Sequence, residues 1–177
     1  LKRIDKRKNF EVTKVVKKER RRQPAAPFTT STMQQEANKR LGYRTRRTMR
    51  IAQSLYEGVN LGKGSVGLIT YMRTDSKRIA NVAKHEASKF IHEEYGENYA
   101  AVKPQHFKND ADAQDAHEAI RPTSAFRTPA SVKEYLTTEE YRLYTLIWSR
   151  FIASQMTPAV YDTVRADIEQ NDVTFRT

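Results

Sequence analysis

The chain has 177 residues, with 32 Lys and Arg against 21 Asp and Glu, and no cysteine. Its length permits one or two domains with a buried core, and the absence of cysteine excludes disulfides and thiolate metal sites. No apolar run approaches the length of a membrane span, so we expect no membrane partner.

The positive charge is concentrated in the first half of the chain. Residues 1–80 carry 21 Lys and Arg and 6 Asp and Glu, a net charge of +15, whereas the remaining residues carry 11 and 15, a net charge of −4. This asymmetry predicts that the first half faces a polyanion, and the interleaving of basic with polar and aromatic residues favours nucleic acid. A solvated basic surface without a partner is the alternative.

Alternating apolar residues predict strands at both ends of the chain. Residues at about 9–17 alternate, and the residues on either side of a predicted turn at 170–172 do so again. The basic run 17–22 could contact DNA phosphates or could shield an edge strand. We expect the two ends to pair, with a helical middle inserted between boundaries near 25–28 and 156–158. The predicted fold is α+β and mainly helical, divided into 1–26, 27–157 and 158–177.

The helical middle is predicted to begin with two short helices. Ser31 with Gln34 fits a capping box for the first helix, and Thr45 can cap the second. Two helices joined by a short link resemble a helix-turn-helix unit. The segment 39–50 holds six basic residues and no acidic one, which predicts phosphate contact; a solvated helix face is the alternative. The candidate DNA contacts on the second helix are Arg46, Arg47 and Arg50.

Apolar residues at helical spacing define the predicted core. On the second helix, Tyr56 is expected to face inward beside Leu55. A later helix is expected from about 77 to 95, with Val82 in its buried stripe. A capping box of Thr137 and Glu140 opens a long helix to about residue 156.

The segment 68–76 has the residue types of a phosphodiester site. Its first half is typical of a buried strand, and its second half is typical of a helix start. Since residues i and i+2 of a strand share a face, Tyr71 and Arg73 are expected to point the same way. The helix N-terminus would add backbone N–H groups that suit a phosphate. The alternative is a core tyrosine and a surface arginine at a strand end.

A second polar segment, 113–122, is predicted to be a short helix or turn that ends before Pro122. If it is helical, His117 and Arg121 share a face. The aspartates at 110, 112 and 115 lack the calcium-loop pattern, and we interpret them as a solvated turn. The four histidines form no tight ligand motif, so no metal site is predicted.

Three segments, in order, resemble the type IA DNA topoisomerase family. Residues 67–76 resemble its active-site tyrosine motif, residues 27–37 the start of its tyrosine-bearing domain, and residues 116–123 its histidine segment. Met72 is similar to the bacterial topoisomerase I branch, because the topoisomerase III branch usually has proline there. We therefore identify the chain as a central fragment that carries the tyrosine domain of a bacterial member.

The resemblance implies an ATP-independent isomerase that relaxes negatively supercoiled DNA by cutting one strand, passing a strand and religating. The Tyr71 phenol would attack a phosphodiester of single-stranded DNA and keep the 5′ phosphate as a phosphotyrosine intermediate. Arg73 would stabilise the developing charge, and His117 would position the DNA backbone. Arg121 and Thr70 are weaker candidates for DNA contact.

The resemblance also implies a helical domain inserted in an arch of β structure, and it shows what this sequence lacks. The family's Toprim domain, with its acidic Mg²⁺ ligands, has no counterpart here. We therefore expect Mg²⁺ to act only in the full-length enzyme, no cofactor to bind this fragment, and the fragment alone to be inactive. A monomer in the bacterial cytoplasm, associated with the nucleoid, is expected.

Two other classes would also use these residues. A non-catalytic DNA-binding module would explain the charge and the helix pair. A tyrosine recombinase would also use Tyr, Arg and His, but that family places His and Arg three apart before a late Tyr. Here His117 and Arg121 are four apart and follow Tyr71.

Overall fold

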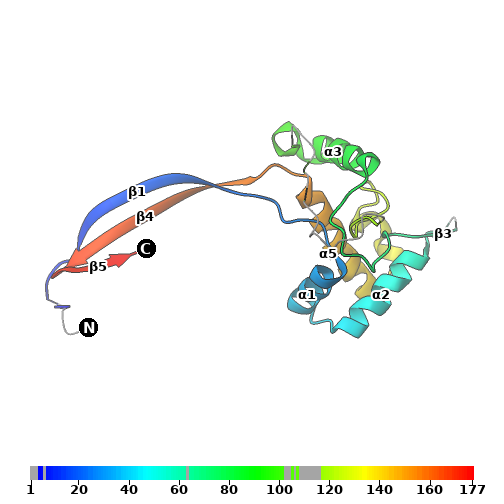
Figure 1. The fold of residues 1–177 in the computed structure, drawn as a ribbon, viewed down its shortest axis with the longest axis horizontal. Helices are drawn as coiled ribbons and strands as arrows, with labels where there is room; N and C mark the ends of the chain where they lie inside the picture. The colour runs from blue at the N-terminus through cyan, green and yellow to red at the C-terminus, as the bar shows by residue number, and fades with distance from the viewer. Residues whose placement is uncertain (1–3, 6, 63, 102–104, 106, 108–116) are drawn as a thin grey trace. The chain divides into compact units, whose positions relative to one another are not determined.

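The chain divides into a β unit, Leu1–Gln23 with Pro158–Thr177, and a helical unit, Pro24–Thr157. The structure is a computed structural model that describes residues 4–5, 7–62, 64–101, 105, 107 and 117–177 (Figure 1). Both helices and strands are present, as the sequence predicts, and the strands of the β unit come from the two ends of the chain.

The β unit is an antiparallel sheet in which β4 (Ala159–Gln170) lies between β1 (Glu11–Arg22) and β5 (Val173–Arg176). The register of β1 and β4 runs from Glu11 opposite Glu169 to Arg22 opposite Ala159, so the predicted pairing of the two ends is confirmed. The predicted end of the first strand near residue 17 is wrong. The basic run 17–22 continues the pairing because alternate cations point to opposite faces of the strand and remain solvated.

Two buried polar side chains stabilise the part of the β unit near the turn between β4 and β5. The Gln170 amide donates to the carbonyl oxygens of Asp5 and Lys8 at 2.9 and 2.8 Å, and it accepts from the Asp5 N–H. The Asp167 carboxylate accepts two hydrogen bonds from Arg176, at 2.7 and 3.1 Å. In this part of the β unit, hydrogen bonds of buried polar side chains provide the stabilisation that an apolar core provides in the helical unit.

The described residues of the helical unit form five α-helices. The first two, α1 (Thr30–Leu41) and α2 (Thr45–Glu57), are joined by three residues, which matches the predicted helix-turn-helix-like pair. After them come α3 (Asn81–Tyr95), α4 (Pro129–Val132) and α5 (Thr138–Ser154). The short elements are β2 (Val59–Asn60), β3 (Ser65–Val66) and the 3₁₀ turns η1 (Glu97–Tyr99) and η2 (Lys133–Tyr135).

Helix caps were predicted with mixed success. The capping box of Thr137 and Glu140 at the start of α5 is confirmed. The box at the start of α1 joins Thr29 to Thr32, so the predicted box of Ser31 and Gln34 is wrong. Several hydroxyl side chains follow one another there, and the first of them is the one with extended backbone that can cap. The cap of α2 is Arg44, without a side-chain hydrogen bond, so the predicted Thr45 cap is also wrong.

The apolar core lies in the helical unit, where α5 packs against α1, α2 and α4. Two residues predicted to face inward do not. Tyr56 is 41% exposed, because it lies beyond the buried face of α2. Val82 is 79% exposed, because α3 begins at Asn81 and not near residue 77. The largest fully buried side chains include Tyr144, Phe28, Phe151, Met33 and Leu55.

Across the parts of the chain that the structure describes, no helix is both long and apolar enough to span a membrane.

Candidate active site

The segment that carries Tyr71 lies against the end of α2. The Leu68 N–H donates to the Leu55 carbonyl oxygen at 2.7 Å. At the preceding residue, Gly67, an added Cβ would lie 2.8 Å from the backbone oxygen of Tyr56, closer than real Cβ contacts permit. Glycine at this position therefore allows the chain to pass the end of α2 and turn toward Tyr71.

On the N-terminal side of Tyr71, the backbone is fixed by segment 117–122. The Thr70 N–H donates to the Arg121 carbonyl oxygen at 2.9 Å, and the Ile69 backbone bridges to Pro122. The Thr70 hydroxyl donates to the Ala119 carbonyl oxygen at 2.8 Å and accepts from the Arg121 N–H at 3.0 Å. The Thr70 side chain thus binds the protein backbone.

On the C-terminal side of Tyr71, the backbone is fixed by the first turn of α1. The Thr30 hydroxyl donates to the Met72 carbonyl oxygen at 2.7 Å and accepts from the Thr74 N–H at 2.8 Å. The Thr30 N–H donates to the Thr74 carbonyl oxygen, also at 2.8 Å, and the Met72 side chain is fully buried. Tyr71 therefore projects from a backbone that is fixed immediately before and after it.

The predicted helix start at residues 74–76 is wrong. These residues belong to no helix or strand, and α3 begins only at Asn81, ten residues after Tyr71. Thr74 and Ser76 are buried and bond to neighbouring backbone instead of capping α3. The free N–H groups expected beside Tyr71 are therefore not those of this helix.

Exposure alternates along the segment. Tyr71, Arg73 and Asp75 are exposed, with 38% of Tyr71 accessible, whereas Met72, Thr74 and Ser76 are buried. The i, i+2 expectation thus agrees with the exposure of Tyr71 and Arg73. The phenol and the guanidinium are both available to a ligand from solvent.

Two aromatic rings flank Tyr71. The His117 ring lies with its centroid 6.0 Å from that of Tyr71, and the Tyr56 ring lies at 5.4 Å in an edge-to-face arrangement. The structure therefore brings Tyr71 and His117 together across 46 residues of sequence. The sequence analysis placed Tyr56 in the core and missed its contact with Tyr71. Tyr56 follows Leu55, the last buried residue of α2, and lies two residues before Gly58, and this position near the helix end was the available indication that its side chain is exposed.

The described part of segment 113–122 contains no helical residue, so the predicted helix that would put His117 and Arg121 on one face is not formed over 117–122. Arg121 Nη2 binds the Glu118 carboxylate at 2.7 Å, Nη1 donates to the Pro122 carbonyl oxygen, and the side chain is 11% exposed. Its Nε is buried without a hydrogen-bond partner among the described atoms. Arg121 is thus fixed within the protein beside the tyrosine segment.

The predicted phosphate-contact arginines of α2 face an acidic residue from α5. Arg47 forms an ion pair with Glu139 and lies over the Tyr43 ring, 4.6 Å from its centroid. Arg50 lies 3.4 Å from the same carboxylate, whereas Arg46 is exposed. The hydrogen bond from Arg47 lowers the pKa of Glu139 below its ordinary value, so this carboxylate stays charged at neutral pH.

The described residues do not gather the ligands that a divalent metal ion needs. Among the described residues, no three His, Asp or Glu side chains come together as ligands would. The aspartates at 110, 112 and 115 lie outside the described residues.

Comparison with known proteins agrees with this arrangement. A family model described as DNA topoisomerase matches residues 1–177. A solved structure of full-length topoisomerase I from Thermotoga maritima is 42% identical, with a TM-score of 0.81, and the match covers 94% of this chain and 26% of that one. The sequence and the fold lead to one conclusion: the chain belongs to the bacterial type IA DNA topoisomerase family.

Proposed function

We propose that Tyr71 is the nucleophile with which this protein cuts one strand of DNA. The observation that carries this proposal is a partly exposed phenol on a backbone fixed on both sides, next to a histidine and two residues from an exposed arginine. A fixed nucleophile reacts faster because less orientational freedom is lost on reaching the transition state. Family membership supplies the reaction class.

The proposed step is a transesterification. The phenol oxygen forms a bond to phosphorus, and the bond between phosphorus and the 3′ oxygen breaks. The phenol loses a proton and the 3′ oxygen gains one, leaving a 5′-phosphotyrosine and a 3′ hydroxyl. Because the ester stores the energy of the broken phosphodiester, the reverse step reseals the strand without a nucleotide.

Arg73 and His117 are proposed to contact the phosphate. A guanidinium can donate two hydrogen bonds to phosphate oxygens as charge develops on them. The His117 ring beside Tyr71 can position the DNA backbone. Arg121 and Thr70, whose side chains bind the protein, are proposed to act by fixing the tyrosine segment, with DNA contact through their exposed atoms only.

The whole enzyme's activity extends beyond these residues, because the chain spans about a quarter of the length of its relative of known structure. We propose that the longer enzyme relaxes negatively supercoiled DNA with Mg²⁺, acts on a single-stranded segment, and works as a monomer in the bacterial cytoplasm at the nucleoid. The helical unit would be its tyrosine domain, inserted in a β arch. The 177-residue chain alone is expected to bind DNA in a salt-sensitive way without relaxing it.

The test is Tyr71→Phe in an enzyme that contains this chain and the remaining family domains. The covalent DNA adduct, detected on a denaturing gel with labelled single-stranded DNA, should be lost, while DNA affinity stays within about twofold because phenylalanine keeps the ring. Tyr56→Phe is the matched control and should keep the adduct. An adduct of normal yield from Tyr71→Phe would support the non-catalytic binding module instead.

A second test addresses the arginines of α2. Glu139→Gln removes the carboxylate that pairs with Arg47 and Arg50, so DNA affinity of the chain should rise about two- to fivefold at low salt. Fluorescence anisotropy with a labelled oligonucleotide measures it. Glu93→Gln on α3 removes the same charge from a pair with Lys89 and should change affinity less. Equal gains from both variants would mean that net charge alone acts and that these arginines make no specific contact.

A further inference from the structure

The two faces of the β1–β4 ribbon carry different charges. Alternate residues of a strand point to opposite faces, and directly paired residues of two strands share a face. Arg20 is paired with Tyr161, Arg22 with Ala159, and Lys18 with Thr163. One face, which we call the cationic face, therefore presents Lys18, Arg20 and Arg22 beside Tyr161, with no acidic residue between positions 18 and 22 or 159 and 163 on that side.

The opposite face is balanced. It presents Lys17, Glu19 and Arg21 from β1 and Asp162 from β4, two cations and two anions. Arg21 also forms an ion pair with Glu19 at 3.0 Å. On the cationic face, by contrast, no ion pair to Lys18, Arg20 or Arg22 occurs among the described residues. Lys18, Arg20 and Arg22 thus have no carboxylate partner among the described residues.

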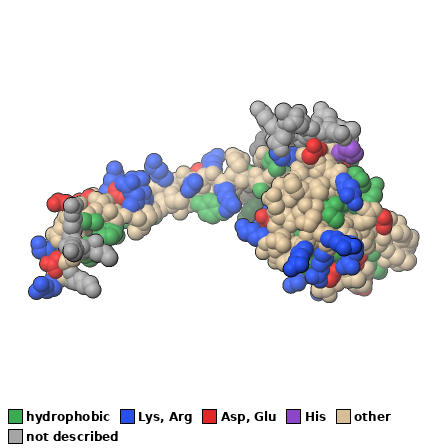
Figure 2. Space-filling view, turned by 60° about the horizontal axis from the view of Figure 1, so that its bottom comes forward, with side chains coloured by type: hydrophobic (Ala, Val, Ile, Leu, Met, Phe, Trp, Pro, Cys, Tyr) green, Lys and Arg blue, Asp and Glu red, His purple; other side chains and the backbone are tan. Residues whose placement is uncertain are grey.

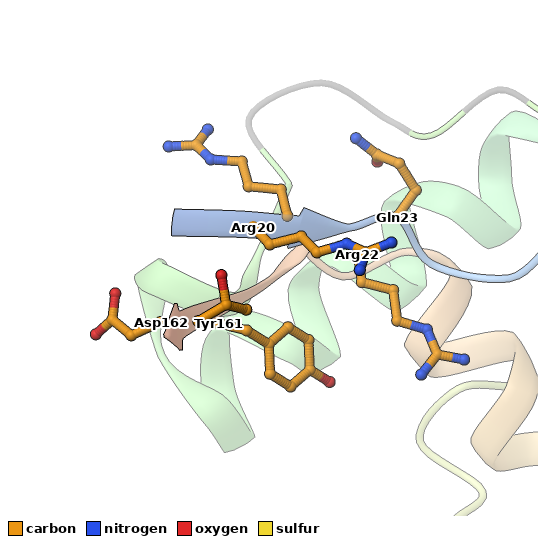
Figure 3. Close-up of a pocket in the computed structure, with 7 residues that line it drawn as sticks. Arg20, Arg22, Gln23, Tyr161 and Asp162 are labelled. Carbon is orange, nitrogen blue, oxygen red and sulfur yellow. The ribbon is translucent and has the colours of Figure 1, made fainter. Parts of the chain in front are cut away.

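A surface hollow of about 700 Å³ opens beside residues 20–23 of the first strand region and residues 161–163 of β4 (Figure 3). Tyr161 lies at its wall and is 49% exposed. Figure 2 shows Lys and Arg side chains gathered along the β unit. Its lining includes Arg20, Arg22, Tyr161 and Thr163 of the cationic face, Arg21 and Asp162 of the opposite face, and Gln23.

We propose that the cationic face is a binding site for a single strand of nucleic acid, separate from the Tyr71 site. Alternate side chains on a strand repeat every ~6.7 Å, so Lys18, Arg20 and Arg22 form a row that can follow successive phosphates. An exposed aromatic ring beside such a row offers a stacking surface to an unpaired base, whose face is hidden in a duplex. The proposal rests on DNA being the partner of this family.

The experiment compares two double variants of the 177-residue chain by fluorescence anisotropy with a labelled oligothymidylate. Arg20→Gln with Arg22→Gln should weaken binding at least about tenfold near 50 mM salt and lower the slope of log affinity against log salt by about 1.4. The matched control, Lys8→Gln with Lys17→Gln, removes the same charge from exposed positions of the β unit that lie outside the hollow and should weaken binding less than about threefold. Equal losses from the two variants would overturn the proposal.

A third variant tests the stacking contact. Tyr161→Ala should weaken binding of oligothymidylate by about fivefold or more and leave binding of a duplex of equal length unchanged within about twofold. Equal losses on both, or no loss on either, would refute the single-strand site. Far-UV circular dichroism of each variant identifies any that has lost the β1–β4 pairing. Tyr161→Phe, which keeps the aromatic ring, should bind oligothymidylate as tightly as the unaltered chain.

These binding measurements involve no cleavage, so they fail or succeed independently of the Tyr71 assignment. In the longer enzyme, Arg20→Gln with Arg22→Gln should still form the covalent adduct at saturating DNA. Loss of the adduct only in Tyr71→Phe, with unchanged binding by the ribbon variants, would leave the nucleophile in place and remove the ribbon site.

Discussion

The helical unit and the β unit are stabilised in different ways. Every buried apolar side chain of the described residues belongs to the helical unit. In the β unit, the buried side chains are Asp167 and Gln170, and the valines of β1 and β4 are mostly exposed. The helical unit therefore owes its stability to apolar burial, and the β unit owes its own to backbone pairing and a few polar contacts.

The two proposed DNA sites also lie in different units, and each unit's kind of stabilisation suits the site that it carries. Tyr71 requires a fixed position, and it lies in the unit with the apolar core. The cationic face requires charge and exposure, which a two-stranded ribbon supplies because neither face has to be buried. Each site therefore lies where its physical requirement is met.

The largest expected difference between the units concerns core substitutions. Phe151→Ala should lower the free energy of unfolding of the helical unit by about 3–5 kcal/mol, because the Phe151 ring is buried and a cavity would remain. Val164→Ala in β4, where the side chain is 61% exposed, should cost less than about 1 kcal/mol. Urea unfolding followed by fluorescence of Trp148, the single tryptophan, measures the first. Circular dichroism measures the second, and comparable losses would contradict the contrast.

A smaller effect is expected where the core meets the Tyr71 site. Gly67→Ala should cost about 1–3 kcal/mol and lower the adduct yield of the longer enzyme, because the new Cβ meets the Tyr56 carbonyl oxygen at 2.8 Å. The control is Gly42→Ala, which strains a left-handed backbone at φ 70° with no atom near the added Cβ. It should cost about 1 kcal/mol and leave the adduct yield unchanged. If both lower the yield alike, general destabilisation is the cause.

The smallest effect concerns pH in the β unit. Hydrogen bonds from Arg176 lower the pKa of the Asp167 carboxyl. The stabilisation is therefore fully present above the ordinary carboxyl pKa, near 4, and is lost as pH falls through the lower folded value. Amide exchange protection at Phe175 in β5 should decrease over that range, and Asp167→Asn should remove the dependence. Asp162→Asn serves as the control, and a pH response unaltered by Asp167→Asn would exclude the pair as its source.

Much of the fold could be predicted from the sequence because its signals are local. Period-two alternation predicted the paired ends, glycines predicted the ends of α1, α2 and α3, and one capping box predicted the start of α5. The start of α3 could not be predicted this way. The hydroxyl side chains of Thr74 and Ser76 accept local hydrogen bonds from the Ser76 and Arg78 N–H groups, and these bonds compete with capping.

The candidate site was only partly predictable from the sequence, because several of its contacts join residues that are far apart in the chain. Motif order brought Tyr71, Arg73 and His117 into one hypothesis, and the structure places His117 beside Tyr71. The role of Thr70 as a backbone contact depends on residues 49 to 51 positions away, and the pairing of Arg47 with Glu139 depends on one 92 positions away. Neither leaves a trace in the spacing of nearby residues.

The proposed cleavage by Tyr71 depends on the hydrogen bonds on either side of this residue. They join the tyrosine segment to residues 42 to 51 positions away in the chain, at Thr30, Ala119 and Arg121. The phenol reaches its position only after these three segments have assembled. A newly made or partly unfolded chain therefore lacks the fixed phenol on which the proposed cleavage depends, and we expect no strand breaks from a protein that has not finished folding.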